Sequence, residues 1–353
     1  MEKIIRRFCL DGNAVSCSRY GSGHINTTCL LETDQQHRYI LQKLNTHVFG
    51  DTQGLMENIA AVTDYLRQLT PRPRRVLTIV PTLDGGLYHE TDKGECWRVF
   101  EFIEGGVCLE QARNAEEFRQ SGRAFGQFQK QLAEFPVERL KETIPQFHDT
   151  PNRFRQLHEA IAADKAGRLV QVQPEVDAYL ACEKAAAELT DMQRAGLLPL
   201  RVCHNDAKLS NVILDAETHE PLCVIDLDTV MPGLAAYDFG DSIRYGASTA
   251  AEDEPDQSRV ALSMTLYRAY AEGFLSACAE RLTKAEIASL PLGAKTITLE
   301  NGVRFLTDYL NGDEYYQISR SSQNLDRCRT HLTLVRDMEA RWQEMQAAVA
   351  PWL

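Results

Sequence analysis

The stretch Cys203–Asp215, CHNDAKLSNVILD, joins a run of polar residues to a short apolar strand signal. Asp206 is followed by Lys208 two positions later and by Asn211 five positions later. A carboxylate can accept a hydroxyl proton, an ammonium group can neutralise negative charge, and an amide oxygen can bind a metal cation. The stretch therefore predicts a catalytic loop with Asp206 as base, Lys208 as charge stabiliser and Asn211 as metal ligand. The alternative is a polar loop whose side chains only cap one another.

A β-hairpin is predicted directly after this loop. VILD, the turn AETHEP and the run LCVID lead to Asp226, fifteen positions after Asn211. A hairpin of this length returns the chain to its starting point, so Asp226 is the predicted second metal ligand. Asp228 shares the same side of an extended chain, and we expect it to support a second ion.

The literal tripeptide Asp-Phe-Gly occurs further on, in AYDFGDS. Its Asp238 lies beyond the loop marked by Pro232 and Gly233, and therefore does not end a strand. We expect Asp238 to cap a helix that begins near Ser242, or to brace the catalytic loop through hydrogen bonds.

The remaining pattern divides the chain into two parts. Segments 27–33, 38–44, 75–86 and 95–106 are typical of strands, and 54–69 of a helix. After Gly106 the signals are mostly helical. We predict an α+β, protein-kinase-like bilobal fold, with a small antiparallel-sheet lobe at residues 1–104 and a large helical lobe at 105–353. The long helical patterns of the second part cover 115–135, 175–194 and 325–349.

The first part contains candidate nucleotide contacts. The turn of Gly21, Ser22 and Gly23 offers backbone amides to phosphates, although a plain hairpin turn has the same composition. Lys43 is a candidate phosphate contact that Glu57 would pair with, and Gln42 occupies the alternative register. The alternatives are an exposed strand lysine and a solvated Glu57. The segment EFIEGG is a candidate hinge, in which Glu101 and Ile103 would hold adenine through their backbone.

Composition excludes several classes of function. A net charge of −12 disfavours nucleic-acid binding, which requires a basic patch. The ten cysteines contain no Cys-x-x-Cys pair, so they are expected to be reduced and without zinc. No apolar run approaches about 18 residues. We expect a cytoplasmic protein with no membrane partner.

Several segments together resemble the aminoglycoside phosphotransferase/choline kinase superfamily, and most closely the bacterial N-acetylhexosamine 1-kinases. The order His-x-Asp-x-Lys-x-x-Asn is similar to the catalytic loop of protein-kinase-like phosphotransferases. The resemblance covers most of the chain, and the block after Asp226 is its most specific part. It is carried by HNDAKLSN, IDLDTVMPGLAAYDFGDSIRYGA, GSGHIN, YILQKLN, VFGDTQGLMENI, FEFIEGG and ENGVRFLTDYLNGDEYY.

This resemblance implies transfer of the ATP γ-phosphate to the anomeric hydroxyl of N-acetylglucosamine or N-acetylgalactosamine, with Mg²⁺. It also implies that His24, Tyr245, Arg304 and Tyr315 (or its neighbour Tyr316) contact the sugar next to Asp206. The alternatives are that His24 braces the glycine turn, that Tyr245 packs in the core, and that Arg304 forms a surface ion pair. The ion-pair partners would be Glu300 and Asp308, four positions to either side.

Other functions remain open. The same fold serves kinases of choline, homoserine or aminoglycosides, and a non-catalytic kinase-fold binding module would look similar without the base or a metal ligand. A protein kinase is disfavoured, because no Ala-Pro-Glu segment follows Asp226. We expect a monomer or a weak homodimer whose partners are ATP and a small sugar.

Overall fold

The computed structural model describes residues 1–21, 25–71 and 74–353. These residues form two compact packing units, each made of segments that are separate in the sequence. The predicted division into two lobes after residue 104 assigns one continuous segment to each lobe. This division remains a prediction. The first unit contains Met1–Val107, Glu134–Pro145 and Ile213–Pro232, and the second contains Cys108–Ala133, Gln146–Val212 and Gly233–Leu353.

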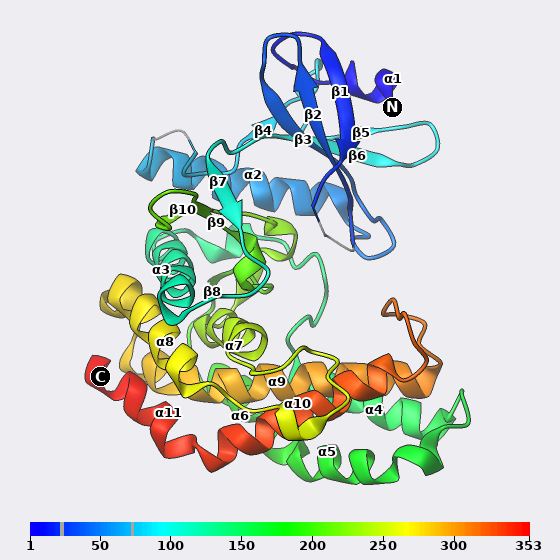
Figure 1. Ribbon diagram of the computed structural model, residues 1–353, viewed down its shortest axis with the longest axis vertical. Coiled ribbons are helices and arrows are strands. Elements are labelled where there is room, and N and C mark those ends of the chain that lie inside the picture. The colour runs from blue at the N-terminus through cyan, green and yellow to red at the C-terminus, as the bar shows by residue number, and fades with distance from the viewer. Residues whose placement is uncertain (22–24, 72–73) are drawn as a thin grey trace. The chain divides into compact units, whose positions relative to one another are not determined.

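An antiparallel sheet dominates the first unit (Figure 1). Its strand order is β1-β2-β3-β6-β4, and β5 pairs with β6. The predicted strands at 27–33 and 38–44 are confirmed as β2 and β3, whereas the predicted strand at 75–86 is reduced to the two residues of β4. The bounds are β1 Ala14–Arg19, β2 Thr27–Thr33, β3 Arg38–Lys43, β4 Ile79–Val80, β5 His89–Glu90 and β6 Cys96–Glu101.

Alternation along these strands produces the core of the first unit. Leu31 on β2, Leu41 on β3 and Val99 on β6 are fully buried on one side of the sheet. Period-2 alternation places such residues on a common face, where burial of each side chain contributes roughly 1.5–3 kcal/mol. The short helix α1 (Glu2–Ile5) adds Ile5 to the same cluster.

Helix α2 (Thr52–Leu69) is the helix predicted at 54–69, extended by two residues. Asp51 caps its first turn, because its carboxylate accepts a hydrogen bond from the Gly54 amide at 2.8 Å. Glu57 on this helix pairs with Lys141 and accepts a hydrogen bond from Gln53. The predicted pairing of Glu57 with the strand lysine is therefore wrong.

A second, three-stranded sheet has the order β10-β9-β7. Gly106 begins β7 at a close approach, since a Cβ atom there would lie 2.2 Å from the Ile213 side chain on β9. The hairpin predicted from VILD to LCVID is confirmed by β9 and β10. The bounds are β7 Gly106–Cys108, β9 Val212–Asp215 and β10 Pro221–Val224.

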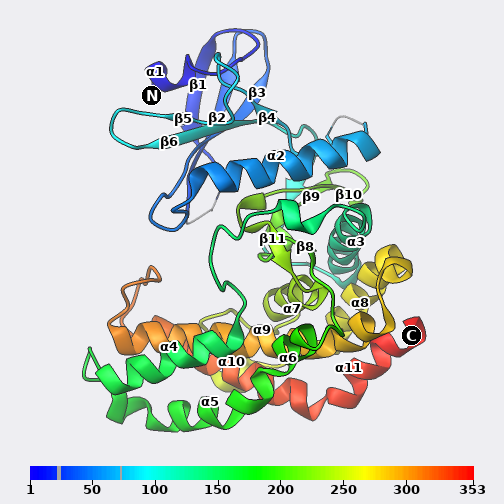
Figure 2. The ribbon, with the colours of Figure 1, turned by 180° about the vertical axis from the view of Figure 1, so that it is seen from behind.

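The second unit is helical, and α9 (Lys284–Asn311) forms its centre (Figure 2). Helices α7, α10 and α4 pack against α9. Gly240 of α7 permits a close approach to α9, because a Cβ atom there would lie 2.4 Å from the carbonyl oxygen of Gly293. The bounds are α3 Ala115–Gln131, α4 Thr150–Ala163, α5 Gln173–Ala186, α6 Glu188–Arg194, α7 Ala235–Gly246, α8 Met264–Cys278, α10 Gln323–Ala340 and α11 Trp342–Val349.

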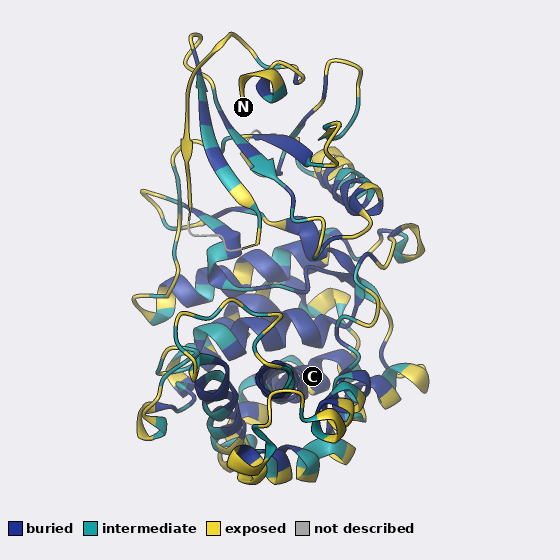
Figure 3. Ribbon diagram, turned by 90° about the vertical axis from the view of Figure 1, so that its right-hand side faces the viewer, coloured by how far each residue is buried: buried dark blue, intermediate teal, exposed yellow. Residues whose placement is uncertain are grey.

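Buried residues gather on the inner helices of this unit, and exposed residues lie on outer turns and loops (Figure 3). The helices predicted at 115–135, 175–194 and 325–349 are confirmed, the last two each as a pair of consecutive helices. Helix α9 was not predicted, and it contains Pro291. Among the described residues, no helix is long and apolar enough to cross a membrane.

His331 on α10 provides a pH-dependent term in stability. Burial lowers its pKa from 6.5 to about 4, with a smaller opposing effect of Glu252 and a smaller lowering effect of Arg244. Its Nδ1 lies 2.7 Å from the carbonyl oxygen of Arg327, and its Nε2 lies 3.4 Å from the Arg244 guanidinium. The unfolded chain therefore binds a proton that the folded chain rejects between pH 6.5 and about 4, so stability falls as pH falls through this window.

We expect the free energy of unfolding to fall by roughly 2 kcal/mol between pH 7 and pH 5, because His331 takes up a proton in the unfolded chain but not in the folded one. Urea titrations at both values should show that His331→Gln loses that much less than the wild type over the same interval. His47→Gln, at an exposed position, is the matched control and should follow the wild type. An identical pH dependence in His331→Gln and wild type would contradict the prediction.

Candidate active site

The predicted catalytic loop follows strand β8 (Arg201–Cys203) in the second unit. The Lys208 ammonium lies 3.1 Å from Asp206 Oδ2, and each side chain is about one-third exposed, 32% and 30%. The Asn211 side-chain amide donates to the Asp206 carbonyl at 2.8 Å and to Oδ2 at 3.1 Å. This use of the Asn211 nitrogen turns its amide oxygen, the atom that suits a hard cation, to the other side of the group. The structure thus brings all three predicted residues together.

The charge state of Asp206 suits an acceptor of a hydrogen bond. Burial alone would raise its pKa, but the Lys208 charge, with His204 and the Asn211 hydrogen bond, holds the pKa below its usual value of 3.8. The carboxylate is therefore ionised at neutral pH. A substrate hydroxyl can donate to it, and the proton can follow as phosphoryl transfer proceeds.

Asp238 braces the catalytic loop, which confirms one of the two roles expected for it. Its fully buried carboxylate accepts hydrogen bonds from the backbone amides of His204 at 2.9 Å and Asn205 at 2.8 Å. The Gln129 side chain of α3 donates to it at 2.9 Å. The expectation of a helix beginning near Ser242 is wrong, because α7 begins at Ala235 and already includes Asp238.

The backbone of Asn205 explains why this brace is needed. Its φ of 63° lies in the left-handed region, which asparagine adopts more readily than most residues. His204, buried on one side of it, packs edge-on against Phe125 with ring centroids 5.5 Å apart. His204 also accepts a hydrogen bond from the Asp206 amide through Nδ1 at 3.3 Å. His204 therefore braces the loop structurally.

His148 supports the loop from another segment of the same unit. Its Nε2 lies 3.2 Å from the Asn205 carbonyl oxygen, and its Nδ1 lies 2.8 Å from Glu300 of α9. The His148 ring therefore links the backbone of the loop to α9. Thr150 also donates to Glu300, at 2.7 Å. Glu300 is therefore engaged by His148 and Thr150.

We expect Asp238→Asn to destabilise the protein by roughly 2–3 kcal/mol, because the amide group turns a donor toward donors and leaves buried groups unsatisfied. Urea unfolding of the variant measures this loss. Asp177→Asn, on the exposed surface of α5, should change stability by less than about 0.5 kcal/mol. An Asp238→Asn variant as stable as this control would show that the brace is dispensable.

The second predicted metal residue, Asp226, belongs to the first unit. It follows β10 by two residues, is exposed, and has a left-handed backbone with φ 59° and ψ 54°. The next residues, Leu227–Thr229, form a 3₁₀ turn. The argument that placed Asp228 beside Asp226 on an extended chain is therefore wrong. Asp228 is instead buried, and it lies 2.6 Å from the Arg98 guanidinium.

The predicted nucleotide contacts of the first unit are placed as follows. Gly21 has a φ of 74°, typical of a turn glycine, while Ser22, Gly23 and His24 lie outside the described residues. Lys43 pairs with Glu95 at 2.6 Å, and both side chains are partly exposed. Glu101, exposed, ends β6, and Ile103 is buried just beyond it. Their roles remain predictions.

Arg304 of α9 is not in the surface ion pair considered as an alternative. Its guanidinium lies over the rings of Phe147 and Tyr316, 5.5 and 5.7 Å from their centroids. Asp308, the second partner considered, instead accepts from the backbone amides of Tyr315 and Tyr316. Since Phe147 precedes His148, Arg304 lies in the part of the second unit that supports the catalytic loop.

The two predicted tyrosines differ in burial. Tyr245, on the last turn of α7, is half-buried, so it is not simply a core residue. Burial raises the pKa of Tyr245, and the charge of Glu110 raises it further, whereas the charge of Lys208 lowers it. The effect of Lys208 indicates that the phenol is close to the catalytic loop. Tyr315 is 62% exposed, and its neighbour Tyr316 is the one that packs beside Arg304.

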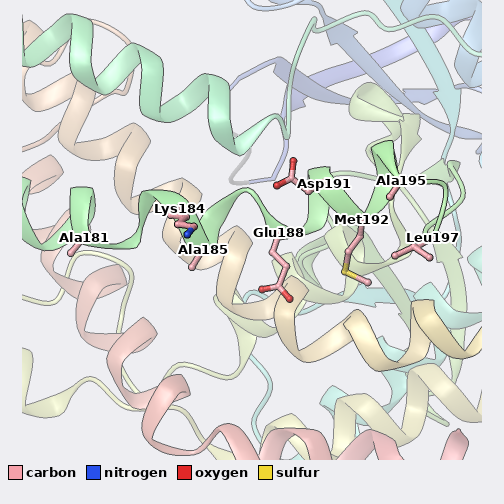
Figure 4. A pocket seen from close by; sticks show the side chains of 8 residues that line it. All are labelled: Ala181, Lys184, Ala185, Glu188, Asp191, Met192, Ala195 and Leu197. Carbon is pink, nitrogen blue, oxygen red and sulfur yellow. The ribbon is translucent and has the colours of Figure 1, made fainter.

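A separate pocket of about 620 Å³ lies on α5, α6 and the loop after them (Figure 4). Its lining contains none of the predicted site residues, and aliphatic groups predominate. Within the described part of the chain, no three His, Cys, Asp or Glu side chains cluster as a metal site. The pocket is lined by Ala181, Lys184, Ala185, Glu188, Asp191, Met192, Ala195 and Leu197.

Sequence reasoning missed the supporting residues of the site. Gln129 and His148 carry no local signal, because their partners lie 109 and 152 positions away. Arg98 did carry one, a single charged residue inside the apolar strand CWRVFE. Asn26, which donates to Asp228 at 2.7 Å, lies in the sequence three positions after the predicted glycine turn.

A braced loop presenting an ionised aspartate, a lysine and an asparagine, followed by a hairpin that ends in a further aspartate, is the arrangement of a phosphoryl-transfer protein. The family model described as "Phosphotransferase enzyme family" matches residues 16–272. This is more than half of the chain, and the protein therefore belongs to the phosphotransferase enzyme family.

Solved structures of similar fold agree with this assignment. A microcompartment-associated aminopropanol kinase is 18% identical, with 98% of this chain and 97% of that chain covered and a TM-score of 0.68. An aminoglycoside phosphotransferase from Alicyclobacillus acidocaldarius is 13% identical over 99% and 96% of the chains, with a TM-score of 0.63. The amicoumacin kinase hAmiN, in complex with AMP-PNP, Ca²⁺ and Ami, is 14% identical over 90% and 87%, with a TM-score of 0.58. These identities support the predicted α+β, protein-kinase-like fold and no finer conclusion.

Proposed function

We propose that the protein is an ATP- and Mg²⁺-dependent kinase that phosphorylates the anomeric hydroxyl of N-acetylglucosamine or N-acetylgalactosamine. The observation that carries the proposal is the ionised Asp206 with Lys208 at 3.1 Å, on a loop braced by Asp238. Asp206 accepts the hydroxyl proton, and Lys208 stabilises charge on the phosphoryl group in transfer. The complex of hAmiN with AMP-PNP supports ATP as the donor.

The cation belongs to the same proposal. Asn211 and Asp226 would hold Mg²⁺, since an amide oxygen and an exposed carboxylate are the hard ligands that this ion accepts. When bound, the ion neutralises charge on the phosphates of the nucleotide. Asp228 is not included, because its carboxylate is already engaged by Arg98 and Asn26.

The acceptor is proposed from the resemblance and from Arg304. The Arg304 guanidinium offers hydrogen-bond donors, and the two aromatic rings in contact with it offer apolar surface, which suits hydroxyl and acetamido groups. It would repel the ammonium group of choline or an amino alcohol. Tyr245 and Tyr316, rather than the exposed Tyr315, are the aromatic residues proposed to contact the sugar ring. An amino-alcohol or aminoglycoside acceptor is the outcome that would displace this proposal.

The test is incubation of the purified protein with ATP and Mg²⁺ and each of N-acetylglucosamine, N-acetylgalactosamine, choline, homoserine and an aminoglycoside. Phosphorus NMR should show a doublet from an anomeric phosphate with the two sugars. The methyl glycoside of N-acetylglucosamine lacks the free anomeric hydroxyl and is the matched control that should give no product. Turnover of the methyl glycoside, or of choline, homoserine or the aminoglycoside alone, would refute the proposed acceptor.

A further inference from the structure

A buried, positively charged side chain, Arg98, lies on the central strands of the first unit. Arg98 of β6 is directly opposite Gln42 of β3, which is opposite Thr28 of β2. Directly opposed residues of antiparallel strands project from the same face, so the three form one row. Arg98 Nε donates to the Gln42 side-chain oxygen at 3.0 Å, and the Gln42 amide donates to Thr28 at 3.0 Å. Arg98 is 1% exposed.

This row ends on the turn that carries Asp226. The Arg98 guanidinium lies 2.6 Å from Asp228 Oδ1, and Asn26 donates to Asp228 Oδ2 at 2.7 Å. Asn26 in turn accepts a hydrogen bond from the Asn45 amide at 2.9 Å. Asp228 is therefore tied to the sheet through Arg98 and to the residue before β2 through Asn26.

A buried ion pair of this kind is weak evidence for stability, since desolvation of both charges offsets their attraction. The position of the Arg98–Asp228 pair next to Asp226 indicates a role in positioning rather than in stability. Asp226 precedes Asp228 by two residues and has a left-handed backbone, which only a well-held segment maintains. Fixing Asp228 therefore fixes the turn at Leu227–Thr229 and the direction of the Asp226 carboxylate.

Lys43 does not supply the positive charge beside Asp228, which comes from Arg98. It is opposite Trp97, in the row next to Gln42, and successive residues of a strand project from opposite faces. Its ammonium lies 2.6 Å from Glu95, with both side chains more than one-third exposed. The predicted strand lysine thus faces away from Arg98 and from the turn that contains Asp228.

We infer that Arg98 is a positioning residue for metal and nucleotide binding. It holds Asp228, and through it the carboxylate of Asp226. The inference rests on the proposed metal role of Asp226 and does not depend on the identity of the acceptor.

The test measures binding of Mn²⁺ and ADP without any acceptor, by electron paramagnetic resonance and calorimetry. Arg98→Gln leaves Asp228 buried without a cation and risks unfolding, so the decisive variant is the double substitution Arg98→Met with Asp228→Leu. An apolar pair of similar volume removes both buried charges together and is expected to fold. We expect this variant to bind Mn²⁺–ADP at least tenfold more weakly than the wild type, at an unchanged urea midpoint.

Two further variants complete the test. Arg98→Lys keeps the charge but not the fork of donors, and should recover part of the lost affinity. Lys93→Gln removes an exposed charge from the turn before β6 in the same unit and should bind Mn²⁺–ADP like the wild type. Wild-type affinity in the double variant, or an equal loss in Lys93→Gln, would overturn the inference. A wild-type protein that binds no Mn²⁺–ADP would overturn the metal role of Asp226 and the inference with it, whereas failure of the sugar acceptor alone would leave these affinities unchanged.

Discussion

Asp206→Asn is expected to lower kcat by about 10²–10⁴-fold, because the amide can no longer accept the proton of the attacking hydroxyl. The change is nearly isosteric. It removes the ion pair with Lys208 but leaves the backbone carbonyl that Asn211 contacts at 2.8 Å. KM for ATP should change far less than kcat, since the lost interaction is one that strengthens in the transition state. Steady-state rates with ATP and N-acetylglucosamine measure both constants.

The control for this variant is Asp191→Asn, an exposed carboxylate on α6 in the same packing unit. It should retain wild-type rates. Circular dichroism and urea unfolding should show that Asp206→Asn is folded, because the brace from Asp238 to the loop backbone is untouched. A folded Asp206→Asn variant with kcat within twofold of wild type would rule out Asp206 as the base.

Local pattern predicted the elements that bear the chemistry. The spacing of Asp206, Lys208 and Asn211 fixed which side chains meet, because all three lie on one short loop where few conformations are possible. The hairpin to Asp226 followed from two apolar runs separated by a polar turn. The helix at Thr52–Leu69 followed from its apolar stripe and its breaker, TPRPRR.

Features that depend on distant partners were not predictable in this way. The predicted direction of the Asp228 side chain was wrong, because a left-handed residue and a 3₁₀ turn replace the extended chain. No glycine or proline in this stretch indicates such a turn. Lys43 pairs with Glu95 rather than with Glu57, and this choice depends on the face of β3 from which the Lys43 side chain projects. Helix α9 was missed because 21 of its residues are buried around most of its circumference, which removes the one-sided periodicity.

Asp226→Asn is the second substitution with a large expected effect. We expect Mg²⁺-dependent turnover to fall by at least about a hundredfold, because a neutral amide replaces a carboxylate at the proposed metal ligand and several kcal/mol of charge stabilisation depend on the ion. Raising the Mg²⁺ concentration should recover part of the rate, since the amide oxygen is a weaker ligand and not an absent one. A titration of initial rate against Mg²⁺ measures this shift.

The fold should tolerate this change, for a reason specific to the backbone. Asp226 has a φ of 59° and is exposed, and asparagine is at least as well suited to the left-handed region as aspartate. Stability should therefore stay within about 1 kcal/mol of the wild type. Glu217→Gln, an exposed charge in the turn of the same hairpin, is the matched control and should leave the Mg²⁺ dependence unchanged. If Asp226→Asn kept the wild-type Mg²⁺ dependence while remaining folded, the metal ligand would have to be sought elsewhere, and the 3₁₀ turn held by Arg98 and Asp228 would lose its proposed purpose.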